Sequence, residues 1–431
     1  MFERIVFLHP DLGIGGAERL VVDAALAVQQ KGYLVQMVTN HHDRSHCFEE
    51  TLTPEVNVTV VGDWLPRSCF GRMMALFAYM RMLFAALYVI LTCSRSKDLI
   101  FVDQISAPLP LFWLFGFKTV FYCHFPDQLL TNREHFLKRL YRLPIDRLEE
   151  WSTGFADQLL ANSQFTASVI RQTFSSLRNR ELQILYPVSN TTSLRLPNSV
   201  LSLDQTDELC GDRTLCRKML TDRSIPSTAR FVFVSLNRYE RKKNLQLALF
   251  ALSHLSTNWN VLIDAEDSDG THFSDVHLII AGGYDSRVTE NVEYHEDLVA
   301  LSEELKVTFI RSCSSEVKAL LIASSDAVVY TPDREHFGIV PIEAMAMSRP
   351  VIALDSGGPH ETIVHGATGY LCPTDSVARL PQLVAECMAR FINDNKLVSR
   401  MGQAARLHVS RNFSFDTFTT RLIDILAKIE T

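Results

Sequence analysis

The chain has 431 residues, more than a single hydrophobic core usually organises, so its length predicts two domains. Its 42 basic and 49 acidic side chains give a formal net charge of −7, which argues against a general nucleic-acid-binding protein. Hydrophobic residues make up 47% of the chain, as in globular proteins, and the nine scattered cysteines form no C-x-x-C pair, which favours a reducing compartment.

The first residues predict a strand, a glycine-rich turn, a helix and a second strand. The strand covers residues 5–8, the helix runs from about 17 to 31 with one apolar face, and the next strand covers 33–39. No basic stretch with a cleavable apolar run precedes the first strand, so we expect no signal peptide. Further buried strands are predicted at 99–102, 119–123 and 158–161. Strands that alternate with helices indicate a parallel sheet covered on both faces.

An apolar segment at 73–91 contains one charged residue, Arg81. As a helix it would be roughly 28 Å long, close to the thickness of a bilayer core. A central arginine costs about 2.5–3.5 kcal/mol on insertion, so two interpretations stay open: a membrane span, or a helix of the first domain that is buried or touches lipid. A second apolar run, 109–122, is interrupted by Pro110, Gly116 and Lys118 and is too broken to span. Together the two runs suggest a surface that lies on a membrane.

A second series of strands follows a polar stretch. We expect a first domain at 1–198, a linker or insertion at 199–226, a second domain at 227–412, and a last helix within 413–431. The fold class is therefore α/β, with two doubly wound, Rossmann-like domains that face each other across a crevice. The strands predicted in the second domain are 231–236, 278–281, 308–311, 327–330 and 351–354.

Two glutamates eight residues apart, Glu335 and Glu343, form the sharpest motif of the chain. Glu335 follows a predicted strand, Gly338 marks a turn, and Pro341 suits the first turn of a helix that would carry Glu343. The N–H groups at the start of that helix would favour an anionic diphosphate. The alternative is an ordinary acidic bias at a helix start.

A basic loop, 237–244, directly follows the strand 231–236. Strand-end loops face the crevice in such sheets, so Arg238 and Lys243 are placed to neutralise a diphosphate leaving group. Arg241 and Lys242 could instead face water, and a solvated basic loop is the competing interpretation.

Weaker signals come from two glycine turns and one histidine. The loop with Gly15 and Gly16 precedes a helix but has Glu18 where a dinucleotide fingerprint requires glycine, so it indicates close approach to a phosphate or sugar without specifying NAD. The second turn is 357–361. His124 follows a predicted strand, and a lone histidine is more often structural.

The motifs, in their order along the chain, resemble those of retaining, family-4-type glycosyltransferases with the GT-B fold. The closer resemblance is to the dolichol-pathway α-1,3/1,6-mannosyltransferases, and the stretches that carry it are 9–19, 39–43, 46–49, 121–127, 237–244 and 281–285. The region 210–223 shows no family pattern.

The resemblance implies an enzyme of the endoplasmic reticulum membrane whose catalytic domains lie on the cytosolic face. It would transfer mannose from GDP-mannose to Man-GlcNAc-GlcNAc-diphosphodolichol, first in an α-1,3 and then in an α-1,6 linkage. The first domain would then be the acceptor side and the second the nucleotide-sugar side, with the last helix returning to the first domain. Membrane lipid and other dolichol-pathway transferases are the implied partners; no nucleic acid, cofactor or metal is expected.

The resemblance also implies roles for single residues. Glu343 would hold the donor ribose, Glu335 the transferred hexose, and Arg238 and Lys243 the diphosphate. Gly16 would let the first domain close over the donor, and His124 would approach the reacting sugar. The implied catalytic residues are Glu335, His124, Arg238 and Lys243, and the implied donor-binding residues are Gly15, Gly16, Arg238, Lys243, Glu335, Phe337, Gly338, Ile339, Val340 and Glu343.

Three other functions stay open at this point. A related transferase would use another nucleotide sugar or lipid-linked acceptor. An NAD-dependent oxidoreductase is disfavoured by Glu18, and a non-catalytic assembly partner is disfavoured by the intact pairs Glu335 with Glu343 and Arg238 with Lys243.

Overall fold

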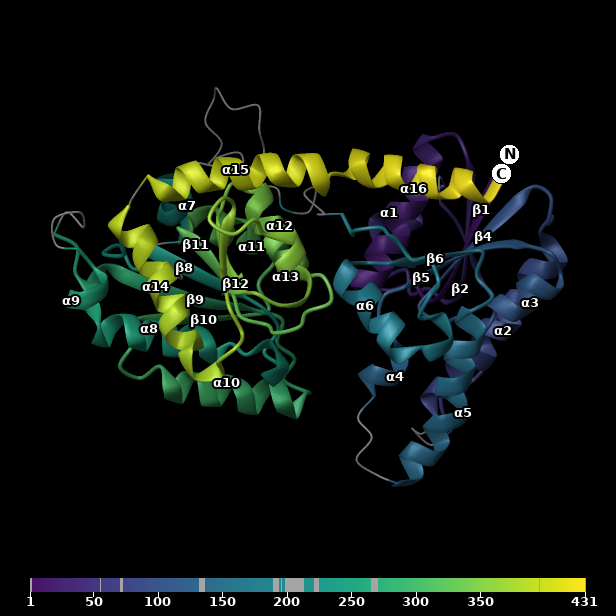
Figure 1. The fold of residues 1–431 in the computed structure, drawn as a ribbon, viewed down its shortest axis with the longest axis horizontal. Coiled ribbons are helices and arrows are strands. Elements are labelled where there is room, and N and C mark those ends of the chain that lie inside the picture. The colour runs from purple at the N-terminus through teal and green to yellow at the C-terminus, as the bar shows by residue number, and fades with distance from the viewer. Residues whose placement is uncertain are drawn as a thin grey trace. The chain divides into compact units, whose positions relative to one another are not determined.

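The structure is a computed structural model, and it describes residues 2–54, 56–69, 73–131, 136–188, 194, 196–197, 213–220, 225–264, 270–394 and 396–430. The chain divides into two compact units. The first comprises Met1–Val188 and Phe415–Thr431, and the second comprises Ser189–Ser414. Each unit is a parallel sheet with helices on both faces, as Figure 1 shows, and this confirms the predicted α/β class.

The first unit contains a seven-stranded parallel sheet in the order β3-β2-β1-β4-β5-β6-β7. Its strands are β1 (Arg4–Asp11), β2 (Leu34–His41), β3 (Asn57–Val60), β4 (Asp98–Asp103), β5 (Lys118–Cys123), β6 (Gln158–Ala161) and β7 (Gln183–Ile184). Its helices are α1 (Gly16–Gln30), α2 (Met74–Thr92), α3 (Leu109–Leu114), α4 (Asp127–Leu130), α5 (Phe136–Thr153), α6 (Gln164–Thr173) and α16 (Phe415–Glu430).

Strand β1 is buried on both faces because neighbouring side chains of a strand point to opposite sides of the sheet. Ile5 and Phe7 join the core beneath α1 and α16, whereas Val6 and Leu8 join the core beneath α2, α3 and α6. The last helix, α16, contributes Phe418, Leu422, Ile425, Leu426 and Ile429 to the α1 side.

The second unit contains a six-stranded parallel sheet in the order β10-β9-β8-β11-β12-β13. Its strands are β8 (Phe231–Leu236), β9 (Val276–Gly282), β10 (Val307–Arg311), β11 (Ala327–Tyr330), β12 (Val351–Leu354) and β13 (Gly369–Cys372). Its helices are α7 (Arg213–Leu220), α8 (Gln246–Thr257), α9 (Trp259–Leu262), α10 (Thr289–Leu301), α11 (Ser315–Ser324), α12 (Ile339–Ala346), α13 (Gly357–Thr362), α14 (Leu380–Asn393) and α15 (Leu397–Asn412).

The domain boundaries differ from those expected at two places. The first unit ends at Val188, whose side chain belongs to the core beneath α1, and residues 189–198 group with the second unit. The segment 199–226, expected to be a linker or insertion, contains a helix, α7, whose Arg213 and Arg217 pair with the buried carboxylate of Asp326. Residues 199–212 and 221–224 lie outside the described part of the chain. The described helix is thus an integral part of the second unit.

Helix α2 covers the sheet of the first unit and has one buried and one exposed side. It contacts β1 and β2, and Tyr79, Arg81, Met82, Ala85, Ala86 and Val89 are its buried residues. Arg81 points into the protein, where its guanidinium donates to the carbonyl of Asn40 at 2.8 Å and lies 3.4 Å from carboxylate oxygens of Asp11 and Asp63. Within the described residues, α2 is the one helix whose length and apolar composition would suit a membrane span.

Candidate functional site

The loop between β11 and α12 carries Glu335. It ends at Gly338, whose φ of +80° is readily adopted only by glycine and which caps α12. The buried ring of Phe337 packs edge-on against Phe413, with ring centroids 6.1 Å apart. Glu335 itself stays partly exposed, with 23% of its side chain accessible. The backbone of the loop is therefore anchored while the carboxylate can reach a ligand.

Two glycines of the turn 357–361 pack against the backbone of the loop that carries Glu335. The N–H of Gly358 donates to the carbonyl of Glu335 at 2.8 Å. A Cβ at Gly357 would overlap the backbone of Glu335, and one at Gly358 would overlap the carbonyl of Phe337. The sequence singled out these glycines without a role; the structure shows that they allow the start of α13 to pack against the Glu335 loop.

The basic loop after β8 meets the Glu335 loop. Strands β8 and β11 are neighbours in the sheet, so their carboxyl ends open on the same edge. The Nζ of Lys243 lies 2.5 Å from Glu335 Oε2, and the hydroxyl of Thr331 donates to the carbonyl of Lys243 at 2.7 Å. The structure thus brings together two residues that lie 92 positions apart in the chain.

The other cations of that loop have different surroundings. Arg238 is exposed over 61% of its side chain and pairs with Glu240 at 2.8 Å, while Arg241 pairs with Asp297 on α10 at 2.7 Å and lies over the ring of Tyr294. Arg241 therefore points to α10 rather than to Glu335. The close approach of the loop to β9 depends on Gly282, where a Cβ would overlap the carbonyl of Asn237.

Glu343 is the fifth residue of α12 and is almost fully buried. The Nζ of Lys318 on α11 lies 2.6 Å from both of its carboxylate oxygens. A buried carboxylate without such a partner would be strongly destabilising. Sequence reasoning missed Lys318, because a single lysine on an ordinary helix carries no motif.

The remaining predicted residues belong to the first unit. Gly15 caps α1, and a Cβ there would lie 2.2 Å from the carboxylate of Glu18, which would have to move aside. Gly16 is exposed, and a Cβ would meet no described atom within 4 Å. Open space around Gly16 leaves its backbone accessible to a ligand.

His124 follows β5 and is tied to a buried carboxylate. Its Nε2 lies 3.2 Å from Asp103 Oδ2, and its carbonyl accepts a hydrogen bond from the side chain of Asn162 at 3.0 Å. Asp103 also contacts His9, with His9 Nδ1 at 2.8 and 2.9 Å from its two oxygens. Sequence reasoning gave no role to His9 or Asp103, although His9 lies in a stretch that carries the family resemblance.

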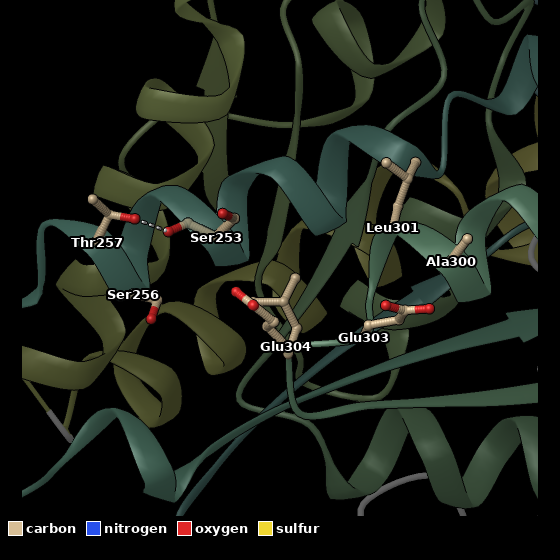
Figure 2. A pocket seen from close by; sticks show the side chains of 8 residues that line it. Ser253, Ser256, Thr257, Ala300, Leu301, Glu303 and Glu304 are labelled. Carbon is tan, nitrogen blue, oxygen red and sulfur yellow. Dashed lines mark hydrogen bonds between the residues drawn. The ribbon is translucent and has the colours of Figure 1, made fainter.

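A separate surface pocket contains none of these residues. It has a volume of about 430 Å³ and lies between α8 and the end of α10, where Ser253, Ser256 and Thr257 face Glu303 and Glu304 (Figure 2). Across the described ranges, no group of three or more His, Cys, Asp or Glu side chains is arranged to hold a metal ion.

Comparison with known families covers most of the chain. The model for "Glycosyltransferase Family 4" matches residues 14–191, and the model for "Glycosyl transferases group 1" matches residues 221–408. The alpha-1,3/1,6-mannosyltransferase ALG2 of Homo sapiens is 46% identical over 433 residues, which cover 99% of this chain and 96% of the human protein. The chain belongs to the α-1,3/1,6-mannosyltransferase family. The family member of Dictyostelium discoideum is 41% identical, over 99% of this chain and 98% of its own. That of Saccharomyces cerevisiae is 40% identical, over 86% of this chain and 74% of its own.

Solved structures support the fold of this mannosyltransferase. A sucrose-phosphate synthase from Thermosynechococcus elongatus superposes with a TM-score of 0.72 at 18% identity, covering 99% of both chains. A glycosyltransferase from Rickettsia africae superposes with a TM-score of 0.70 at 16% identity, covering 100% of this chain and 99% of its own. At these identities the likeness concerns the fold alone, and it confirms the predicted GT-B class.

Proposed function

We propose that this α-1,3/1,6-mannosyltransferase takes mannose from GDP-mannose and extends Man-GlcNAc-GlcNAc-diphosphodolichol, first by an α-1,3 and then by an α-1,6 mannose. The observation that carries the proposal is the cluster at the carboxyl ends of β8 and β11, where Lys243 contacts Glu335 while Glu343 lies on the following helix. A cation and two carboxylates at this edge suit an elongated ligand that has an anionic diphosphate between two hydroxylated ends.

In this proposal the second unit stabilises the leaving group. Lys243 and Arg238 bind the diphosphate and neutralise the charge that develops as the bond to mannose breaks. Lys243 can exchange Glu335 for the phosphate, because the carboxylate and the phosphate are both anions. Glu335 then accepts hydrogen bonds from hydroxyls of the hexose. The segment from Phe337 to Val340 presents the start of α12 to the phosphates.

Glu343 binds the ribose in this proposal. Its burial and its contact with Lys318 fix the carboxylate in one orientation, so little conformational entropy is lost when two ribose hydroxyls donate to it. The first unit contributes the accessible backbone of Gly15 and Gly16 to the donor and the imidazole of His124 to the reacting sugar.

The apolar outer surface of the first unit supports contact with the membrane that holds the lipid-linked acceptor. Met80, Phe84, Leu87 and Leu91 recur at helical spacing on the exposed side of α2. The end of α3 adds Trp113 and Leu114, and Phe115 follows it; these residues are between 38% and 84% exposed. Because Arg81 pairs inside the protein, we propose that α2 lies along the cytosolic face of the endoplasmic reticulum membrane instead of crossing it.

The donor and acceptor are tested with purified protein, GDP-mannose and a lipid-linked trisaccharide, with products analysed by mass and by linkage-specific mannosidases. We expect addition of two hexoses that α-1,3- and α-1,6-specific mannosidases remove. The matched variants are Glu335→Gln, expected to be inactive, and Glu303→Gln, a surface carboxylate at the pocket of α8 and α10, expected to be active. Transfer from UDP-sugars but not GDP-mannose would overturn the proposal.

Membrane contact is tested by flotation with liposomes. The variant Met80→Glu, Leu87→Glu, Leu91→Glu places charges on the exposed side of α2, and we expect it to fold but to lose flotation. The control replaces three exposed apolar residues of the second unit, Phe250, Val261 and Val299, by glutamate. Equal flotation of both variants would place the membrane contact elsewhere.

A further inference from the structure

Three polar side chains of the first unit meet at the carboxyl ends of adjacent strands. His9 lies on β1, Asp103 ends β4, and His124 follows β5, and these strands are neighbours in the sheet. Asp103 is fully buried and lies between the two imidazoles, 2.8 Å from His9 Nδ1 and 3.2 Å from His124 Nε2. His9 is also buried, at 1% exposure, whereas 22% of the His124 side chain is exposed. His124 is thus the outer member of a buried histidine–aspartate–histidine chain.

His9 has acceptors at both of its ring nitrogens. Nδ1 faces the carboxylate of Asp103, and Nε2 lies 3.1 Å from the carbonyl oxygen of Asp11 and 3.9 Å from Glu18 Oε1. Only the protonated ring donates from both nitrogens. Burial by itself lowers the pKa of His9, but the carboxylates of Asp103 and Glu18 outweigh burial and raise the pKa to about 10. His9 is therefore a buried cation at neutral pH.

The charge of Asp103 is balanced by that cation. Burial by itself would raise the pKa of Asp103, but its contacts with His9 and His124 hold it below its ordinary value, so the carboxylate stays ionised. The titratable groups that face this chain are Glu18 from α1 and Tyr122 from β5; the hydroxyl of Tyr122 donates to the carbonyl of Leu185, away from Asp103.

We propose that Asp103 and His9 are positioning residues for His124. The carboxylate of Asp103 accepts a hydrogen bond from Nε2–H of His124 and so fixes both the orientation and the tautomer of the ring, which leaves Nδ1 as a hydrogen-bond acceptor. His9 supplies the positive charge that balances the buried carboxylate of Asp103. This inference rests on the proposed role of His124 beside the reacting sugar.

The arrangement suits glycosyl transfer for an electrostatic reason. Positive charge develops on the sugar ring as the bond to the diphosphate breaks, and a neutral imidazole that accepts a hydrogen bond stabilises it whereas an imidazolium would oppose it. A lone Asp103 beside His124 would favour the imidazolium, since an unbalanced carboxylate stabilises the charged ring. The buried His9 prevents this without touching the sugar.

The charge of His9 is tested without reference to activity. In protein labelled with ¹³C-histidine, the Cε1–Hε1 signal of His9 is assigned as the one that His9→Asn removes. We expect this signal to keep the chemical shift of an imidazolium from pH 5 to about 9, and to titrate in the ordinary range in Asp103→Asn. A His9 signal that titrates between pH 6 and 7 in the wild-type protein would overturn the proposal, even if the enzyme transfers mannose normally.

The effect on His124 is read from the pH dependence of kcat. In His9→Asn the buried carboxylate of Asp103 loses its counter-charge, so the acidic limb of the profile should move up by about one pH unit or more. In Asp103→Asn the limb should move down, and kcat should fall at least about tenfold, the lower end of the effect of removing the outer partners of metal-ligating histidines. The KM for GDP-mannose should change little in either variant.

The control is His277→Asn, which replaces a buried histidine of β9 that bonds to Thr308 in the second unit. This variant should change neither the value of kcat nor the acidic limb of its pH profile. A purely structural role predicts lower kcat with an unmoved limb in all variants, and that result would overturn the positioning role. If His124→Asn keeps full activity while the His9 signal behaves as expected, the role of His124 in the proposed function fails and the charge arrangement stands.

Discussion

Replacing Gly358 by alanine should disturb catalysis through the backbone of the Glu335 loop. The Cβ of an alanine there would lie 2.0 Å from the carbonyl oxygen of Phe337 and 2.4 Å from its carbonyl carbon. Both are backbone atoms, so no side-chain rotation relieves the overlap. To reach the 3.4 Å of ordinary contact, the loop and the start of α13 must separate by about 1.4 Å. Glu335 moves with the loop, because its carbonyl accepts from the N–H of Gly358.

The size of the effect follows from that displacement. A misplacement of about 1 Å in a positioned group can lower turnover by about a hundredfold, so kcat of Gly358→Ala should fall by at least that factor. Overpacking of this kind costs about 1–3 kcal/mol, which leaves most of the protein folded at the assay temperature. Loss of activity should therefore exceed loss of folded protein.

The assay is single-turnover transfer from GDP-mannose to the lipid-linked acceptor, with thermal unfolding measured on the same samples. Gly402→Ala is the matched control, since its Cβ would overlap the carbonyl of Ser348, a backbone contact between α15 and the second residue after α12. Both variants should be destabilised to a similar extent, and only Gly358→Ala should lose activity about a hundredfold. Near-normal turnover in Gly358→Ala would refute the reasoning that places Glu335 in the site.

Three further predictions concern charged groups. Lys318→Met leaves the buried carboxylate of Glu343 without its cation, so titration calorimetry should show weaker GDP-mannose binding, and the free energy of unfolding should fall by about 3 kcal/mol or more; unchanged donor affinity would argue against Glu343 as the ribose ligand. Lys243→Ala should lower kcat by about a hundredfold or more, the scale of losing a preorganised charge, whereas Arg241→Ala, whose guanidinium pairs with α10, should stay near wild type in the same transfer assay. Because the pKa of His9 is raised to about 10, its stabilisation is complete below about pH 6.5 and is lost as pH rises towards 10; urea unfolding should show wild type losing about 3 kcal/mol more than His9→Asn between pH 7 and 9.5, and parallel curves for the two proteins would contradict the raised pKa.

Much of the fold could be read from local patterns. The expected strands 158–161, 231–236, 327–330 and 351–354 match β6, β8, β11 and β12, because strands buried on both faces appear as continuous apolar runs. Such runs do not indicate three other strands: β3 is partly or fully exposed along its length, β7 has only two residues, and β13 begins at a glycine. Helix α7 lies in the segment expected to be a linker or insertion, and no local pattern indicates its contacts, because Asp326 lies more than a hundred residues away in the chain.

For the site, the sequence by itself determined which residue types follow which strands. The rule that parallel strands present their carboxyl ends on one edge was enough to predict that Lys243 and Glu335 lie close together, as they do in the structure. Only the tertiary structure decided the partners: Lys318 for Glu343, Asp103 for His124, and the two glycines under the Glu335 loop. These contacts depend on side-chain direction and on backbone clearance between segments far apart in sequence. The spacing of residues along the chain predicts neither side-chain direction nor backbone clearance, because both depend on how separate strands and helices pack around a common core.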